Sequence, residues 1–116
     1  MNSPPAAYRV EAVAYCGTPE PCMFHLGDRF STEAGEARQW AGERATQIAA
    51  SLGPEDPGTA ARFLAWAHDV ATARTHHLLL AGQAVIYSCA GDDCLWELSL
   101  RPLPQYPTPL QEPGQA

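Results

Sequence analysis

The sequence contains no lysine: all seven basic side chains are arginines, against thirteen acidic ones. Without lysine, the chain can neither form a Schiff base with a carbonyl substrate nor build the lysine clamp of a P-loop. The net charge of −6 gives no general attraction for nucleic acids or anionic lipid surfaces, because these are negative themselves. The same charge suits a basic surface on a protein partner.

Long apolar runs are also missing. No stretch approaches the roughly 18 apolar residues of a membrane-spanning helix, so we expect no membrane association. Residues 1–13 lack the basic and apolar regions of a secretory signal. We therefore expect a cytoplasmic protein. In that reducing compartment cysteines are more often free or metal-bound than joined in disulfides.

Proline is unevenly distributed along the 116 residues. Pro4 and Pro5 interrupt the start of the chain, and five further prolines lie between residues 102 and 113. The chain as a whole is 46% hydrophobic and 17% charged, which is typical of a folded domain rather than a disordered chain. We predict a flexible lead over residues 1–7, a single domain over 8–103 and a proline-rich flexible tail over 104–116.

The strongest strand signal lies between Ala84 and Leu103, where two runs of β-forming residues flank the turn sequence Ala90–Asp93. A four-residue loop at this turn would place Cys89 opposite Cys94. Because side chains alternate along a strand, this register places both cysteines on one face of the hairpin together with two apolar pairs. We expect that face to form the centre of the core. The further pairs on this face are Tyr87 with Trp96 and Val85 with Leu98.

An earlier stretch of the chain repeats this pattern. Tyr8–Cys16 alternates as a strand should, Gly17–Pro21 is rich in turn residues, and Cys22–Leu26 forms a second short strand. In this hairpin Cys16 lies opposite Cys22, on the face that we assign to the core.

Two helices are predicted between the hairpins. Thr32–Leu52 has small and apolar residues at i, i+3 and i+4 spacing, and Pro57–Arg74 follows the N-cap Asp56 with the same period. We interpret Thr75–Leu80 as a further strand. The fold class is therefore α+β, an antiparallel sheet in the chain order ββααβββ packed on a helical hairpin. The residues expected together in the core are Tyr87, Trp96, Leu98, Phe24, Ile48, Leu52, Phe63 and Leu64.

The four cysteines are the sharpest candidate site. Cys16 and Cys22 lie on one hairpin and Cys89 and Cys94 on the other, as the four thiolates of a zinc ribbon do. The first pair has a wider spacing than the usual zinc knuckle, and the predicted faces point the sulfur atoms inward. We favour unligated buried thiols and no cofactor, with zinc and hairpin disulfides as the alternatives.

Signals for catalysis are weak. The sequence contains no glycine-rich phosphate loop, no G-x-S-x-G and no H-E-x-x-H motif. His76 and His77 are neighbours on the predicted strand, so their rings would point to opposite faces. Asp92 and Asp93 lie in a turn, where aspartate is common because its side chain supports turns. We therefore expect a protein that is not an enzyme.

The outer face of the predicted sheet offers a different kind of site. With the cysteines on the core face, the opposite face carries more apolar side chains than a sheet facing water needs. Such a surface is typical of a site that binds a protein partner or a second copy of the chain. The alternative is that a helix covers this face, in which case the core face and the outer face are assigned the wrong way round. The residues of this candidate partner-binding surface are Val13, Tyr15, Met23, Ile86 and Leu95.

The sequence therefore predicts a small acidic binding protein of the accessory or inhibitor type. Its richness in alanine, glycine, proline and arginine suggests a bacterial or mobile-element gene. The alternative function is a zinc-stabilised module in which Cys16, Cys22, Cys89 and Cys94 hold the metal.

Overall fold

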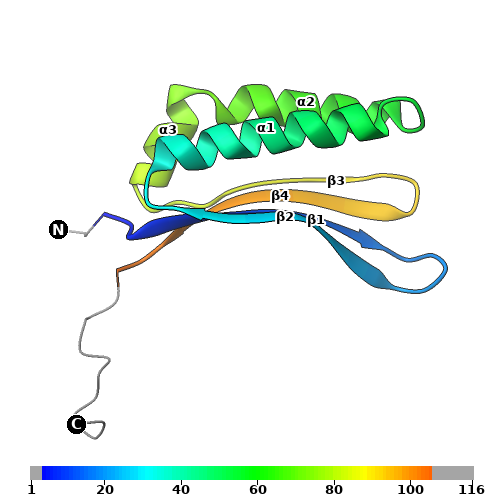
Figure 1. Ribbon diagram of the computed structural model, residues 1–116, viewed down its shortest axis with the longest axis horizontal. Helices are drawn as coiled ribbons and strands as arrows, with labels where there is room; N and C mark the ends of the chain where they lie inside the picture. Colours follow the sequence, from blue (N-terminus) through cyan, green and yellow to red (C-terminus); the bar gives the residue numbers. More distant parts are fainter. Residues whose placement is uncertain (1–3, 106–116) are drawn as a thin grey trace, which may run out of the picture.

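The computed structural model describes residues 4–105. Parts of the predicted lead and nearly all of the predicted tail lie outside the described residues, so the domain boundaries remain predictions. The structure has two layers, with helices along one side of an antiparallel sheet (Figure 1). Its elements are β1 (Ala7–Cys16), β2 (Cys22–Ser31), α1 (Ala34–Leu52), α2 (Pro57–Val70), α3 (Ala73–Leu80), β3 (Val85–Ala90) and β4 (Cys94–Leu103).

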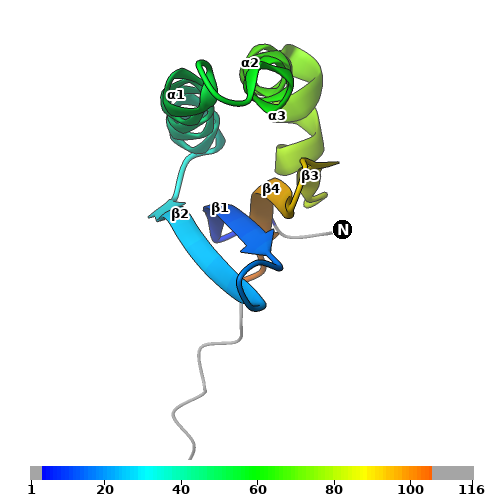
Figure 2. The same ribbon diagram turned by 90° about the vertical axis from the view of Figure 1, so that its right-hand side faces the viewer.

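The sheet has four strands in the order β2-β1-β4-β3, and every neighbouring pair is antiparallel. The two hairpins therefore meet through their longer strands, β1 and β4, and both hairpin turns lie at the same end of the sheet (Figure 1). All three helices lie on one face of this sheet (Figure 2). The predicted fold class, an antiparallel α+β sheet packed on a helical hairpin, is confirmed.

The helix α2 begins at a side-chain cap, whereas Glu33, the N-cap residue of α1, makes no such hydrogen bond. Asp56 accepts a hydrogen bond from the Thr59 N–H (3.1 Å) and precedes Pro57, the first residue of α2. At α1 the Ser31 hydroxyl accepts from the Glu33 N–H (3.0 Å) and donates to Glu36 (2.8 Å). The small residues predicted to form a stripe face the sheet: the buried residues of α1 are Ala34, Ala37, Ala41, Ala45, Ile48 and Ala49.

The predicted strand Thr75–Leu80 is wrong, because this stretch is the helix α3. Thr72 caps the helix by accepting from the Thr75 N–H (3.3 Å), and Thr75 and Leu79, four residues apart, are fully buried on one helical face. The Thr75 hydroxyl also donates to the Asp69 carbonyl (2.9 Å). The chain order is therefore ββαααββ rather than ββααβββ.

The register of the β3–β4 hairpin differs from the prediction by two residues. Cys89 lies opposite Trp96 rather than Cys94, and the Gly91 N–H donates to the Cys94 carbonyl (2.7 Å). The strand pairing therefore continues as far as Gly91 and Cys94, and only two residues, Asp92 and Asp93, remain in the turn. Because a shift of two residues preserves the alternation, the predicted core face of this hairpin still faces the helices.

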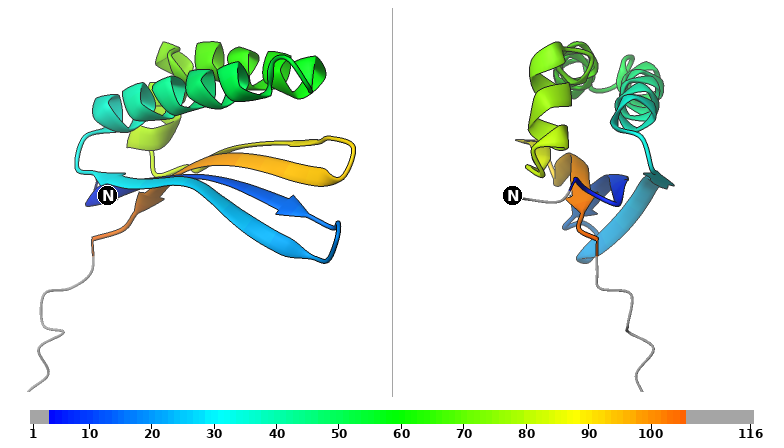
Figure 3. Two further views of the ribbon diagram at one scale, coloured as in Figure 1. Left: turned by 45° about the vertical axis from the view of Figure 1, so that its right-hand side comes forward. Right: turned by 90° about the vertical axis from the view of Figure 1, so that its left-hand side faces the viewer.

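In the β1–β2 hairpin the predicted register holds near the turn, where Cys16 lies opposite Cys22. Further along, Leu26 is an extra residue in β2, so that Val13 pairs with His25 and Ala12 with Gly27. The hairpin curves away from the helical layer toward its turn (Figure 3).

The core lies between the sheet and the helices. Of the predicted core, Leu98, Phe63 and Ile48 are buried, and Tyr87, Trp96 and Leu52 are partly buried against them. Two expectations are wrong: Phe24 is 52% exposed and Leu64 is 45% exposed. Phe24 lies opposite Ala14, two residues from the end of β2 at Cys22, and Leu64 lines the groove between α1 and α2.

Candidate functional site

The sheet face opposite the helices is open: no element within residues 4–105 covers it (Figure 2). In β1 the odd-numbered residues from Arg9 to Tyr15 point to this face, because the even-numbered ones from Tyr8 to Ala14 are buried toward the helices. The predicted alternative, in which a helix covers this face, is therefore wrong for the described residues.

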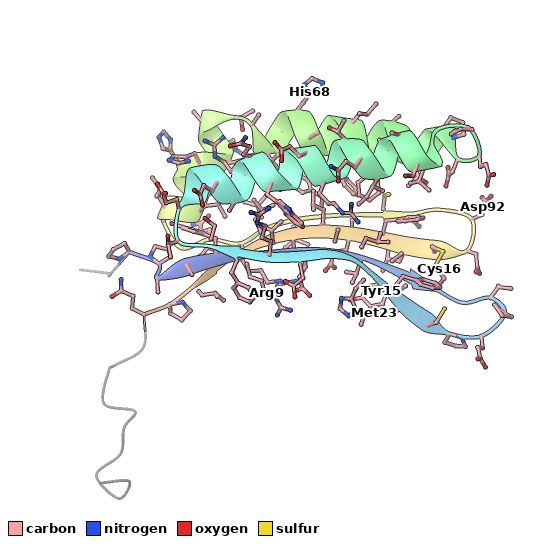
Figure 4. All side chains as sticks on the ribbon, viewed as in Figure 1. Arg9, Tyr15, Cys16, Met23, His68 and Asp92 are labelled. Carbon is pink, nitrogen blue, oxygen red and sulfur yellow. A yellow bond between two sulfur atoms is a disulfide. The ribbon has the colours of Figure 1, made fainter. Side chains whose placement is uncertain are left out.

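Three large apolar side chains lie next to one another across the open face near the hairpin turns. Met23 is opposite Tyr15, and Tyr15 is opposite Leu95 on the other side. They are 47%, 42% and 44% exposed, respectively. Tyr15 and Met23 lie on the side of the sheet away from the helices (Figure 4). We call these three residues the tip row.

The tip row contains three of the five residues predicted to bind a partner. Val13, two positions along β1 from Tyr15, also belongs to this face but is only 4% exposed, so it offers little surface to a partner. Ile86 is exposed, but it lies on β3 opposite Ser99, away from the tip row. The candidate surface is therefore smaller and closer to the hairpin turns than the sequence predicted.

Charged side chains lie elsewhere on the open face, together with Phe30 and Ile86, which are 58% and 48% exposed. Arg9 donates two hydrogen bonds to the Asp28 carboxylate (3.1 and 2.9 Å) and lies 3.2 Å from Glu11. The hydrogen bonds from Arg9 lower the pKa of Asp28 below its usual value. The Arg9 guanidinium also lies over the Phe30 ring, 5.5 Å from its centroid. Arg9 is thus held in place and its charge is largely matched by these two carboxylates.

A second ion pair on this face joins Arg101 and Glu97 at 3.6 Å. Together with the Arg9 cluster, the face carries three carboxylates, of Glu11, Asp28 and Glu97, against two guanidinium groups. The open face therefore shares the acidic sign of the whole chain, although less strongly.

The cysteines lie on the other side of the same end of the sheet. Cys22, Cys16 and Cys94 are direct neighbours across β2, β1 and β4. Cys16 and Cys94 form a disulfide with an S–S distance of 2.11 Å (Figure 4). Cys22 and Cys89 are free thiols and half-buried. We call Cys22, Cys16 and Cys94 the cysteine row.

The disulfide corrects two expectations. Cys16 and Cys94 are not free thiols, and the bonded pair joins two hairpins rather than closing one of them. Cys89 and Cys94 are not opposed, since Cys89 faces Trp96. The pairing arises because the sheet order places β1 beside β4, and this order did not follow from the sequence.

Within residues 4–105, no group of three or more histidine, cysteine, aspartate or glutamate side chains is arranged to hold a metal ion. The disulfide also occupies two of the four sulfur atoms that the zinc alternative requires as thiolates. In the described part of the chain, no helix is both long and apolar enough to cross a membrane.

A polar cavity of about 430 Å³ lies between the start of α2 and the β3–β4 turn. Asp56, Arg62, Cys89 and Asp92 are among its lining residues. Burial raises the pKa of the Cys89 thiol, which disfavours the reactive thiolate. The Asp56 carboxylate is engaged by Thr59, whose hydrogen bonds lower its pKa. The hydrogen bonds between Asp56 and Thr59 cap α2, and the Cys89 thiol in the same cavity is not activated as a nucleophile.

The histidines are separate from this cavity. The Nδ1 atom of His76 accepts a hydrogen bond from Arg38 (3.1 Å), His25 pairs with Val13 in the sheet, and His68 points to solvent (Figure 4). The structure thus supplies no catalytic pair built on Cys89 and a histidine.

Comparisons with family models, curated proteins and solved structures find no significant match to this chain. The surface itself therefore carries the functional argument.

Proposed function

We propose that this protein is a small acidic, non-enzymatic binding protein of the accessory or inhibitor type, which docks on another protein through its open sheet face. The observation that carries the proposal is the tip row, where Met23, Tyr15 and Leu95 are adjacent, large, apolar and nearly half exposed. Contiguous exposed apolar groups of this kind are typical of interaction sites, whereas scattered ones are not.

The size of the open face suits a protein partner. Four strands at about 4.8 Å spacing and about ten residues of 3.3 Å rise give a flat area on the order of 600 Å². A stable interface buries about 800 Å² on each partner, counted over the rough molecular surface. The partner would therefore cover most of the face, with the tip row as the apolar part of the contact at the hairpin-turn end.

The net negative charge of the chain favours a partner with a basic surface. Two copies, each with a net charge of −6, repel one another, whereas a basic protein is attracted over distances of about one Debye length. On the same face as the tip row, the three carboxylates of Glu11, Asp28 and Glu97 outnumber the two guanidinium groups that pair with them. The partner we propose therefore presents an apolar patch bordered by lysine or arginine.

The disulfide bears on where the protein acts. In the cytoplasm, disulfides are usually transient and redox-active, whereas stable ones are typical of oxidising compartments. If the protein is cytoplasmic, as the sequence predicts, the Cys16–Cys94 disulfide belongs to the transient, redox-active class. No observation favours the zinc-stabilised alternative.

Photo-crosslinking in cells of the source organism tests the proposed surface. A photoreactive phenylalanine analogue replaces Tyr15 in one sample and Leu64 in the matched control, because both side chains are similarly exposed but lie on opposite layers. We expect a crosslink from position 15 to a basic protein and none from position 64. Equal crosslinking from both positions, or crosslinking only to a second copy of this chain, would refute the proposal.

A further inference from the structure

Cys16 lies between two other cysteines on the central strand β1. Cys94 is its neighbour on β4 and holds it in the disulfide, and Cys22 is its neighbour on β2 and carries a free thiol. Because directly opposed residues lie on the same face of a sheet, all three side chains leave the sheet on one side. The sulfur of Cys16 therefore has a possible bonding partner on each side.

The backbone hydrogen bonds distinguish the two sides. Opposed pairs in an antiparallel ladder alternate between hydrogen-bonded and non-hydrogen-bonded. The Gly17 N–H donates to the Asp93 carbonyl (3.2 Å), so the next pair, Cys16 with Cys94, is non-hydrogen-bonded. Its Cα–Cα distance of 4.1 Å agrees with this assignment.

A residue that does not bond to one neighbouring strand directs its N–H and C=O to the other. Cys16 and Cys22 are therefore a hydrogen-bonded pair, for which the Cα atoms lie about 5.5 Å apart. This separation falls inside the usual range of about 4.4–6.8 Å for disulfides, and the 4.1 Å of the Cys16–Cys94 pair lies just below that range. The Cβ atoms of directly opposed residues lie about 4.5–5.5 Å apart, against about 3.5–4.5 Å in a disulfide. A bond from Cys16 to Cys22 therefore needs a shift of about 1 Å at the end of the β1–β2 hairpin, but no change in the order of the strands.

The other combinations of cysteines are excluded by distance. Cys22 and Cys94 lie two strands apart, as do Cys16 and Cys89, which is about 9.6 Å at normal strand spacing, and Cys22 and Cys89 lie three strands apart. Cys89 is diagonal to Cys94, and such positions are separated by about 7–8 Å. Disulfides do not bridge Cα atoms more than about 7 Å apart without backbone movement. Only two disulfides are compatible with the sheet, and both contain Cys16.

We propose that the cysteine row is a disulfide-exchange site in which Cys16 alternates between Cys94 and Cys22. The Cys22 thiolate attacks the Cys16 sulfur, the bond to Cys94 breaks, and a bond between Cys16 and Cys22 forms. Cys94 leaves as a thiolate and takes up one proton, which balances the proton lost by Cys22. The number of disulfides is unchanged, so the step needs no external oxidant or reductant.

The order of the strands supports this chemistry. In thiol–disulfide exchange the attacking and leaving sulfur atoms lie on opposite sides of the central one. The sheet order β2-β1-β4 places Cys22 and Cys94 on opposite sides of Cys16. The exchange moves the covalent link from between the two hairpins to within the first hairpin. The inference does not depend on the proposed docking function.

Peptide mapping can follow the exchange, because arginines are the only trypsin sites in a chain without lysine. Residues 10–29 form one peptide with Cys16 and Cys22, and residues 75–116 form another with Cys89 and Cys94, since Pro102 blocks cleavage after Arg101. A Cys16–Cys94 bond links the two peptides. A Cys16–Cys22 bond leaves them separate.

The experiment uses the oxidised full chain, incubated in native buffer at pH 8 without added thiol, alkylated in acid and digested. We expect the separated peptides to increase with time at a rate that does not depend on protein concentration. The Cys22→Ser variant should remain fully linked, and the Cys89→Ser variant should behave like the natural chain. The inference is overturned if the natural chain stays linked, if the rate rises with concentration, or if Cys89 joins Cys16.

A second experiment starts from reduced variants and asks which disulfides form on oxidation. With oxidised glutathione, the folded Cys94→Ser variant should form the Cys16–Cys22 bond within one peptide. The Cys16→Ser variant should form no bond between Cys22 and Cys94. Free Cys16 and Cys22 in the first variant, or a Cys22–Cys94 bond in the second, would contradict the assigned geometry.

Discussion

Replacing Cys16 with serine should strongly reduce the free energy of unfolding, because the Cys16–Cys94 disulfide closes a loop with a sequence separation of 78. In the chain-entropy relation a loop of this length contributes about 4.5 kcal/mol. A domain of this size has a total stability of about 5–15 kcal/mol. The loss should therefore remove about 30% or more of the stability of the protein.

The short alternative disulfide should contribute less. Cys16 and Cys22 are six positions apart, so the same relation gives about 2 kcal/mol for their loop. The Cys94→Ser variant, oxidised to the Cys16–Cys22 form, should therefore lie between the oxidised natural chain and Cys16→Ser. Cys89→Ser is the matched control and should change the stability by about 1 kcal/mol or less, because this thiol is in neither bond.

Urea titration followed by tryptophan fluorescence measures these differences, with the disulfide state of every sample verified by thiol counting. From most to least stable, we expect the oxidised natural chain, then oxidised Cys94→Ser, then Cys16→Ser. If Cys16→Ser loses less than about 1 kcal/mol, a value far below the entropy of the closed loop, the disulfide does not join the two hairpins as described.

Three further substitutions test the packing. Gly27→Ala should cost about 1–3 kcal/mol in a urea titration, because a Cβ atom there would lie 2.8 Å from Cη2 of Trp40; an unchanged stability would contradict the contact between β2 and α1. Leu98→Ala should cost about 2–5 kcal/mol, since Leu98 is fully buried between the layers. Tyr87→Phe removes the hydrogen bond to the Asp69 carboxylate and should cost about 1–3 kcal/mol. Burial and Asp69 raise the pKa of Tyr87, so the folded protein holds this proton more tightly than the unfolded chain; stability should fall as the pH rises above about 10, and the fall should be smaller in Tyr87→Phe.

The sequence predicted the helices and the strand faces that depend on the spacing of neighbouring residues. The helices α1 and α2 followed from the spacing of small and apolar residues and from the cap at Asp56. Alternation placed the cysteines and the apolar surface on opposite faces, and a register shift of two residues left that assignment intact. The helix α3 was missed because Thr75–Leu80 is short and combines a β-branched residue with a run of apolar ones.

The candidate sites depended on contacts that are distant in the sequence. The disulfide was missed because Cys16 and Cys94 meet only when β1 pairs with β4, and no turn links these strands. The tip row needs the same pairing, since Leu95 comes from β4 and Met23 from β2. Phe24 was assigned to the core because alternation identifies a face but not how far the helices extend over it.

The central claim is that the open sheet face binds a basic protein through the tip row. The most direct measurement is the dissociation constant of the protein crosslinked at position 15 for the natural chain, Tyr15→Asp and Leu64→Asp. Both substitutions place the same charge at a similarly exposed position. Tyr15 lies on the open sheet face and Leu64 lies on the helical layer, so the comparison tests which of the two surfaces binds the partner. We expect Tyr15→Asp to weaken binding at least about tenfold, which is a loss of about 1.4 kcal/mol, and Leu64→Asp to change it less than about twofold, within the usual effect of a surface substitution. Equal weakening by both variants, or none by Tyr15→Asp, would contradict the claim.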